Sequence, residues 1–162
     1  MELATPPCPP PAEAPPEKPP EAPPRLDVLV TSVASDAHTW NLIYLQLLLE
    51  ESGHRVTNLG ACVPDQLMVD ECRTRRPDLI VISTVNGHGS NDGRRVVRRL
   101  RDCAELRTTP IVIGGKLGIT GGEHDGHMDE LVEAGFNAVF EDSAGIVGFR
   151  DFVRALPAGA AR

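Results

Sequence analysis

Residues 25–60, RLDVLVTSVASDAHTWNLIYLQLLLEESGHRVTNLG, decide the fold class of this chain. A short apolar run at residues 26–31 is followed by a segment of helical periodicity at 39–52 and by a second short run at 55–59. Gly53 follows the helical segment, where glycine commonly ends a helix. A strand, a helix and a strand in this order are typical of the repeating unit of a parallel sheet.

The same alternation continues along the rest of the chain. Three further strands and four further helices are predicted at residues 79–83, 111–113 and 138–140, and at 64–75, 92–103, 128–134 and 146–155. Because crossovers between parallel strands are right-handed, this order predicts an α/β fold: a Rossmann-like (flavodoxin-like), doubly wound, five-stranded parallel sheet flanked by helices. Ligands bind such sheets beyond the carboxyl ends of the strands, so the loops after the first four strands are the places to search for a site.

The two ends of the chain depart from this pattern. Eleven of the fifteen prolines precede Arg25, and that segment has almost no apolar side chain to bury. We expect a disordered Pro-rich leader at residues 1–24, one folded domain at 25–156 and a disordered tail at 157–162. The leader lacks the apolar core of a secretory signal, and no later run has the roughly 18 apolar residues of a membrane span. We therefore expect a cytoplasmic protein.

Charge and cysteine content narrow the choice of partners. The net charge of −7 argues against nucleic acid as a partner. The four cysteines are widely spaced and include no C-x-x-C, so neither a disulfide framework nor a cysteine zinc site is indicated. We expect free thiols in a reducing compartment.

The loop after the first strand, SVASDAHTWN, carries the first candidates for chemistry. Asp36 and His38 lie two residues apart, just before the first helix. A carboxylate bonded to one ring nitrogen of a histidine fixes the tautomer and raises the basicity of the other nitrogen, which can then bind a metal. The alternative is that Asp36 or Thr39 only caps the helix and that His38 is a solvated loop residue.

The loops after the third and fourth strands, ISTVNGHGSND and VIGGKLGITGG, are rich in glycine. Ser83 ends the third strand, with Gly87 and Gly89 close behind it, and Gly114 and Gly115 leave no side chain at the end of the fourth. Glycine there lets the backbone approach a ligand, although turn geometry alone also selects it. No G-x-G-x-x-G follows the first strand and no G-x-x-x-x-G-K-[ST] occurs, so the common nucleotide fingerprints are missing.

Together these loops resemble the cobalamin-binding domain family. D-x-H before the first helix, S-x-V after the third strand and G-G after the fourth match the family's D-x-H-x-x-G, S-x-L and G-G set. The longer strings SDAHTWNLIYLQLLLEESGHRVTNLG and VISTVNGHGSNDG look most like the small subunits of glutamate mutase, also called methylaspartate mutase subunit S. The resemblance covers residues 25–156.

The resemblance implies that the cofactor is adenosylcobalamin, bound through a histidine. His38 would displace the cofactor's own dimethylbenzimidazole base and become the lower axial ligand to cobalt. Asp36 would hydrogen-bond His38 from behind. The displaced nucleotide tail would then lie in a slot between the sheet and the helices.

The resemblance also assigns residues to that slot. Ser83 would hydrogen-bond the tail, Val85 would line the slot, and Gly114 and Gly115 would allow a close approach. The other residues that we expect to contact the cofactor are Ser35, Ala37, Thr39, Thr84 and Lys116.

The sequence departs from the family at the motif glycine, which is Asn41 here. Its amide would narrow the tail slot, or it would donate a hydrogen bond to the tail or to the loop. We expect a local loop shift to accommodate it. Val85 in place of the motif leucine is a milder change.

The activity that the resemblance implies belongs to an adenosylcobalamin-dependent carbon-skeleton mutase, with a rearrangement of the L-glutamate to 3-methylaspartate type. The cofactor supplies the radical chemistry. A separate, larger barrel subunit would bind the amino acid and close over the corrin, because this chain is too small to hold both. The alternative is a corrinoid carrier or a cobalamin-sensing module without mutase activity. A response-regulator domain is a third hypothesis, disfavoured because the third strand ends in Ser83 rather than in an aspartate.

The remaining clusters are interpreted as structural. The EHDGH segment (Glu123, His124, Asp125 and His127) is taken as a solvated helix start rather than a metal site. His88 either faces the cofactor or a partner, or lies in an exposed turn. His54 and the cysteines are expected to be structural.

For two sets of residues in the predicted helices, we also expect structural rather than binding roles. A solvated face is favoured over a binding surface for the arginines of residues 92–103, namely Arg94, Arg95, Arg98, Arg99 and Arg101. Core positions are expected for the helically spaced residues Trp40, Leu45, Leu48 and Leu49.

Overall fold

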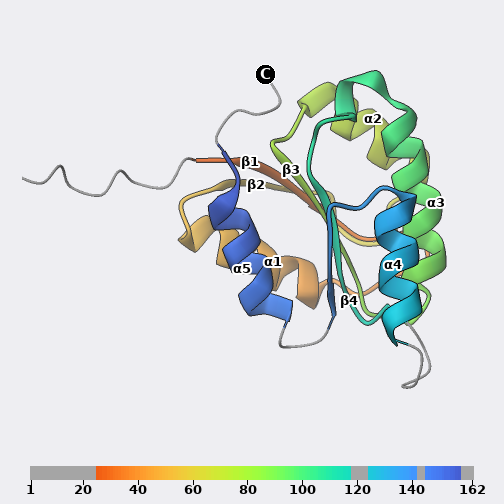
Figure 1. Ribbon diagram of the computed structural model, residues 1–162. Coiled ribbons are helices and arrows are strands. Elements are labelled where there is room, and N and C mark those ends of the chain that lie inside the picture. Colours follow the sequence, from red (N-terminus) through yellow and green to blue (C-terminus); the bar gives the residue numbers. More distant parts are fainter. Residues whose placement is uncertain (1–24, 118–123, 142–144, 158–162) are drawn as a thin grey trace, which may run out of the picture.

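The computed structural model describes residues 25–117, 124–141 and 145–157 of the chain (Figure 1). These residues contain one five-stranded parallel sheet with the strand order β2-β1-β3-β4-β5. The strands are β1 (Asp27–Thr31), β2 (Arg55–Asn58), β3 (Leu79–Thr84), β4 (Ile111–Gly115) and β5 (Ala138–Glu141).

Helices cover both faces of this sheet. They are α1 (Trp40–Glu51), α2 (Asp65–Arg75), α3 (Gly89–Asp102), α4 (His124–Ala134) and α5 (Gly145–Ala155), with a 3₁₀ turn, η1 (Ala104–Leu106), after α3. Helices α1 and α5 pack on one face, and α2, α3 and α4 pack on the other (Figure 1). This is the doubly wound, Rossmann-like arrangement, so the predicted fold class is confirmed.

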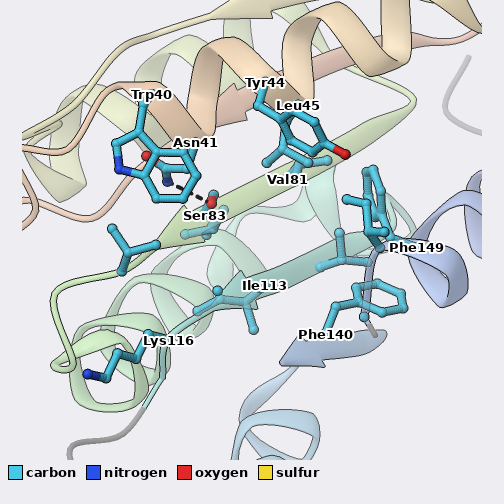
Figure 2. A pocket seen from close by; sticks show the side chains of 17 residues that line it. Trp40, Asn41, Tyr44, Leu45, Val81, Ser83, Ile113, Lys116, Phe140 and Phe149 are labelled. Carbon is cyan, nitrogen blue, oxygen red and sulfur yellow. Dashed lines mark hydrogen bonds between the residues drawn. The ribbon is translucent and has the colours of Figure 1, made fainter. Parts of the chain in front are cut away.

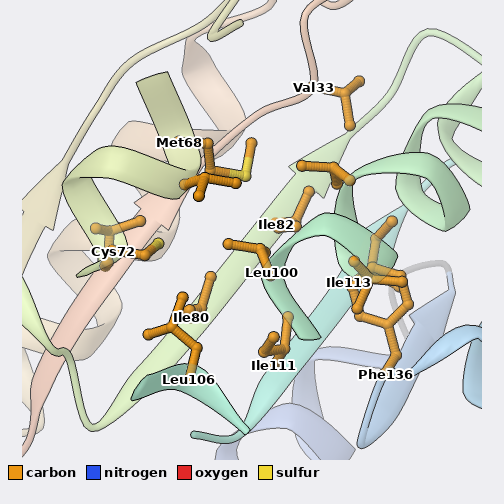
Figure 3. Packing of buried hydrophobic residues seen from close by; sticks show 14 of the residues in the cluster. Val33, Met68, Cys72, Ile80, Ile82, Leu100, Leu106, Ile111, Ile113 and Phe136 are labelled. Atoms are coloured by element: carbon orange, nitrogen blue, oxygen red, sulfur yellow. The ribbon is translucent and has the colours of Figure 1, made fainter. Parts of the chain in front are cut away.

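Each central strand divides its side chains between two cores. On β3, Ile80 and Ile82 point toward α2, α3 and α4, whereas Leu79 and Val81 point toward α1 and α5. Figure 3 shows the first of these cores, with Ile80 and Ile82 lying among side chains from the helices. Because both faces of the strand are buried, its first four residues, 79–82, form an uninterrupted apolar run rather than an alternation of polar and apolar residues.

Helix α3 begins at Gly89, three residues before the predicted start at residue 92. A Cβ atom at Gly89 would lie 2.3 Å from Cγ2 of Thr84, so the helix start packs closely on the end of β3. The backbone N–H of Ser90 donates to the carbonyl of Leu117 at 3.2 Å. Tertiary packing therefore places a glycine and a serine, two weak helix formers, in the first turn.

The other elements follow the predicted ranges with two exceptions. Strand β4 runs two residues beyond the predicted range 111–113, because Gly114 and Gly115 pair with Ser83 and Thr84 of β3. Helix α4 begins at His124, four residues before the predicted start at residue 128. The η1 turn was not predicted.

The predicted leader and residues 158–162 of the predicted tail lie outside the described residues, as does Glu123 of the EHDGH segment. Within the part that the structure describes, no group of three or more His, Cys, Asp or Glu side chains is placed to hold a metal ion. No helix in that part is long and apolar enough to cross a membrane. Cys62, Cys72 and Cys103 are free thiols, and burial raises the pKa of Cys72 to about 12.

The arginines of α3 are solvent-accessible, with Arg95, Arg98 and Arg99 exposed, and some of the five also bind neighbouring elements. Arg95 binds the Asp65 carboxylate of α2 through Nε and Nη2, at 2.7 and 3.1 Å. Arg101 donates to the backbone carbonyls of Leu106 and Thr109 at 2.9 and 2.8 Å. These two side chains connect α3 to its neighbours through charge-assisted hydrogen bonds.

Candidate functional site

Asp36 lies where the loop after β1 meets the end of β3, at the carboxyl edge of the sheet. Its side chain is fully buried. Oδ2 accepts hydrogen bonds from Thr84 Oγ1 and from the backbone N–H of Val85, both at 2.7 Å. The carboxylate therefore fastens its own loop to the neighbouring strand.

The other oxygen of Asp36 holds His38. Oδ1 accepts the backbone N–H of His38 at 3.0 Å and lies 2.7 Å from His38 Nδ1. Because a carboxylate can only accept, Nδ1 carries the proton, and in the neutral imidazole Nε2 keeps a free lone pair. The His38 side chain is 50% exposed, so the ring is open to a ligand.

The charge on Asp36 is set by its partners. Burial by itself would raise the pKa of Asp36, but the hydrogen bonds from His38, Val85 and Thr84 outweigh burial and lower the pKa to about 2. Asp36 is therefore an anion at neutral pH. A carboxylate bonded to Nδ1 fixes the tautomer and the orientation of the His38 ring.

Further hydrogen bonds bring three loops together around Asp36. Asn86 Nδ2 donates to the carbonyl and hydroxyl oxygens of Ser35, at 3.0 and 2.9 Å, and the Ser35 hydroxyl bonds Asp92 in the first turn of α3. The backbone N–H of Cys62, which follows β2, donates to the Asp36 carbonyl at 2.8 Å. The site is thus braced by loops from β1, β2 and β3.

A pocket of about 450 Å³ lies beside this network, between the carboxyl end of the sheet and helices α1 and α5 (Figure 2). Its volume is in the range of small-molecule and cofactor sites. The walls are mostly apolar, and four of the six aromatic residues of the chain line them, Trp40, Tyr44, Phe140 and Phe149. Sequence reasoning missed these four as site residues, although aromatic side chains are scarce in this chain.

Ser83 and Thr84 join the pocket to the Asp36 network. They are consecutive residues of a strand, so their side chains point to opposite faces of the sheet. Thr84 bonds Asp36, whereas Ser83 lines the pocket and accepts a hydrogen bond from Asn41 Nδ2 at 2.8 Å. The amide of Asn41 therefore donates to the strand and not to the loop, and because Asn41 lines the pocket, narrowing of the slot and a bond to the tail stay predictions.

Gly114 and Gly115 line the same pocket, and the sheet itself requires them to be glycines. A Cβ at Gly114 would lie 2.9 Å from the carbonyl oxygen of Phe140. Gly115 has a φ of +112°, and a Cβ there would lie 2.1 Å from the carbonyl oxygen of Thr84. Lys116 follows at the pocket, with an exposed side chain and a backbone N–H that donates to Thr84 at 2.9 Å.

The predicted site residues thus fall into two adjoining groups. Asp36, His38, Thr84 and Val85 form the hydrogen-bonded network. Val85 also lines the pocket, together with the predicted residues Ser83, Gly114, Gly115 and Lys116. The remaining three, Ser35, Ala37 and Thr39, are exposed in the loop before α1.

The capping part of the alternative for this loop is wrong, although His38 is half-exposed as that alternative expected. Thr39 is the N-cap residue of α1, but its side chain makes no capping hydrogen bond. Asp36 directs its oxygens to His38, Thr84 and Val85 instead of to the helix. The aspartate therefore has the partner that the metal-binding interpretation requires.

Trp40 is not a core residue, contrary to the expectation from its spacing. Its side chain is 63% exposed and stands at the pocket above Ser83 (Figure 2). Leu45 also lines the pocket, whereas Leu48 and Leu49 are buried in the core as expected. Helix α1 therefore contributes side chains both to the core and to the pocket wall.

Similar proteins of known sequence include a mutase subunit and a regulator. The glutamate mutase sigma subunit of Fusobacterium nucleatum is 25% identical over 114 residues, which cover 70% of this chain and 83% of that protein. The HTH-type transcriptional repressor CarA of Myxococcus xanthus is 34% identical over 88 residues, which cover 54% of this chain and 30% of the repressor.

Solved structures share the fold. A cobalamin-binding protein from Desulfitobacterium hafniense has a TM-score of 0.62 at 22% identity, over 80% of this chain and 59% of that chain. The receiver domain of sensor histidine kinase PA1611 from Pseudomonas aeruginosa has a TM-score of 0.59 at 17% identity, over 82% of this chain and 97% of that chain. Because two different classes of protein fit about equally well, these likenesses show the fold alone.

The family comparison is more specific. The family model described as the B12 binding domain matches residues 26–139, which is more than half of the chain. The matched range contains Asp36 and His38, the Ser83–Thr84 step and the two pocket glycines. The chain belongs to the B12-binding domain family.

Proposed function

We propose that this chain binds adenosylcobalamin with His38 as the lower axial ligand to cobalt, as the cobalamin-carrying subunit of a glutamate mutase-like enzyme. The observation that carries the proposal is the Asp36–His38 pair, with 2.7 Å between Oδ1 and Nδ1. Since Nδ1 is occupied, the neutral imidazole offers only Nε2 to a metal. A carboxylate behind a ligating histidine is the arrangement that orients the ring and raises its basicity.

The neighbouring pocket fits the nucleotide tail that His38 would displace. It is open at the same edge of the sheet, and its aromatic walls suit a flat heterocycle. The Ser83 hydroxyl provides a hydrogen-bonding group, and Gly114 and Gly115 keep one wall free of side chains. The cofactor would therefore be held in its base-off form, with the tail between the sheet and helices α1 and α5.

When bound, adenosylcobalamin supplies a carbon radical by homolysis of its cobalt–carbon bond. The residues of this chain bind and orient the cofactor: Asp36 fixes the ring of His38, and Thr84 and Val85 fix Asp36. With the pocket given to the tail, the amino acid, L-glutamate in the proposed rearrangement to 3-methylaspartate, would bind a separate, larger barrel subunit. The relative from Fusobacterium nucleatum, named as a glutamate mutase sigma subunit, supports this assignment.

A cobalamin sensor is the second candidate. The observation in its favour is the 34% identity to the repressor CarA over 88 residues. This chain spans only 30% of that repressor, and the mutase subunit is matched over 83% of its length, which favours the mutase. Isomerisation of glutamate on addition of a large mutase subunit would distinguish the two candidates.

Electron paramagnetic resonance of the full chain loaded with cob(II)alamin tests the axial ligand. The cofactor is labelled with nitrogen-15 in its dimethylbenzimidazole, so a nitrogen-14 superhyperfine triplet can come only from the protein. We expect this triplet in the wild type, its loss in His38→Ala and its retention in His88→Ala, which removes another exposed histidine. A nitrogen-15 doublet in the wild type, or a triplet that survives in His38→Ala, would contradict the proposal.

A further inference from the structure

We propose that Asn41 makes the pocket selective for cobamides whose lower base carries a hydrogen-bond donor next to an acceptor, as adenine does. Cobamides are the cobalamin analogues that differ in this base. The inference rests on the proposed function, because it takes the pocket to be the slot for the nucleotide tail. It concerns a residue in which this chain departs from the D-x-H-x-x-G pattern, where a glycine would offer no side chain at all.

Asn41 is a polar side chain in an apolar environment. It lies in the first turn of α1, is only 5% exposed and lines the pocket together with Ser83 (Figure 2). Its Nδ2 donates to Ser83 Oγ at 2.8 Å. Its Oδ1 is buried and accepts no hydrogen bond from any of the residues that the structure describes.

An amide oxygen that is buried without a donor destabilises the protein, and nearly all such groups in folded proteins are paired. Asn41 Oδ1 is therefore an acceptor whose partner is expected from outside the described residues. The pocket that Asn41 lines is the space from which a ligand can supply that partner.

Ser83 supplies the complementary group. Its oxygen is already occupied as an acceptor by Asn41 Nδ2, which leaves its O–H free to donate. Ser83 and Asn41 of the pocket wall thus carry a donor, Ser83 Oγ–H, and a buried acceptor without a partner among the described residues, Asn41 Oδ1.

This pair matches one class of lower base better than another. Adenine carries a ring nitrogen that accepts and, next to it, an exocyclic amino group that donates, so it satisfies both Ser83 and Asn41. Dimethylbenzimidazole has only a ring nitrogen that accepts once it has left the cobalt, so Asn41 Oδ1 would stay unpaired. The aromatic walls formed by Tyr44, Phe140 and Phe149 stack against either flat base and do not distinguish them.

The experiment compares the equilibrium affinities of the full chain for three cobamides. Their lower bases are adenine, dimethylbenzimidazole and benzimidazole, which has nearly the size of adenine but no donor. The variants are Asn41→Gly, which restores the family residue, and Asn41→Ala, which also removes the amide but keeps a good helix former. His38→Ala is run in parallel, and the axial nitrogen is recorded for each complex.

We expect the wild type to bind the adenine cobamide about tenfold more tightly than the other two, as one additional buried hydrogen bond allows. Both variants should bind all three with similar affinity. Equal affinities in the wild type, or an adenine preference that survives in both variants, would overturn the inference. A wild-type preference for dimethylbenzimidazole that the variants lose would also overturn it, since the amide would then present its NH₂ to the base.

The same data separate this inference from the proposed function. If the cobamides bind with a protein-derived axial nitrogen that His38→Ala removes, but without base selectivity, only the role of Asn41 is wrong. If no cobamide binds, or binding leaves His38 unligated, the proposed function and the inference both fail.

Discussion

Asp36 is the residue whose function depends most strictly on being a carboxylate. Thr84 Oγ1 and the Val85 N–H donate to one of its oxygens, while His38 occupies the other with a backbone N–H and a ring nitrogen. An asparagine has one acceptor oxygen, so its NH₂ group would face the backbone N–H of His38 or that of Val85, neither of which can accept. A substitution that changes only one heavy atom therefore breaks at least one hydrogen bond and sets two N–H donors against each other.

Replacing Asp36 with asparagine should accordingly weaken both binding and folding. We expect the dissociation constant for cobalamin to rise about 10- to 100-fold and the free energy of unfolding to fall by about 1–3 kcal/mol. Trp40, the single tryptophan of the chain, lies at the pocket, so quenching of its fluorescence measures binding, and urea denaturation measures stability. Asp70→Asn, at an exposed acid on α2, is the control. Unchanged affinity and stability in Asp36→Asn would show that the carboxylate is dispensable.

Among the elements, the strands could be predicted well and the pocket walls poorly, for separate reasons. A strand buried on both faces has an unbroken apolar sequence, and that property is local. Helix α1 is apolar on nearly all sides, with Leu42 and Leu49 buried but Ile43 and Leu47 exposed, so helical spacing could not tell which side faced the pocket. The D-x-H pair was predictable because both partners lie within three residues. The Asn41–Ser83 bond was not, because 42 positions separate its partners.

The end of strand β4 provides a test at the scale of elements. Gly115→Ala would put a Cβ 2.1 Å from the carbonyl oxygen of Thr84 at a φ of +112°, so backbone must move. We expect a loss of about 1–3 kcal/mol in the free energy of unfolding and weaker cobalamin binding, because Thr84 also holds Asp36. The matched control is Gly148→Ala on α5, where the added Cβ would lie an ordinary 3.6 Å from Cε1 of Phe140. This variant should leave the free energy of unfolding unchanged or increase it. Equal stability in the two variants would mean that β4 tolerates a side chain at its end.

Across the whole molecule, the sheet has one edge at the amino ends of its strands and another at their carboxyl ends, here called the amino edge and the carboxyl edge. The two differ in how their polar groups are hydrogen-bonded. At the amino edge, the backbone N–H of Leu26 donates to His54 Nδ1 at 3.3 Å, and that of Asp27 donates to Asp78 Oδ2 at 2.8 Å. Buried side chains of the protein itself thus bind the start of β1. At the carboxyl edge, the His38 side chain is half-exposed, and the buried oxygen of Asn41 has no partner among the described residues. We infer that one edge serves stability and the other serves binding.

The amino edge should make the stability of the fold depend on pH. His54 is buried, and burial lowers its pKa below the roughly 6.5 of free histidine. The unfolded chain therefore takes up this proton first, and the free energy of unfolding should fall as the pH decreases below about 6.5. His54→Asn offers Leu26 a carbonyl acceptor that does not titrate, so urea midpoints measured between about pH 7 and pH 5 should decline less steeply. His88→Asn, at an exposed histidine, should keep the wild-type slope. If the urea midpoint of His54→Asn declined with pH as steeply as that of the wild type, the acid sensitivity would arise elsewhere in the molecule.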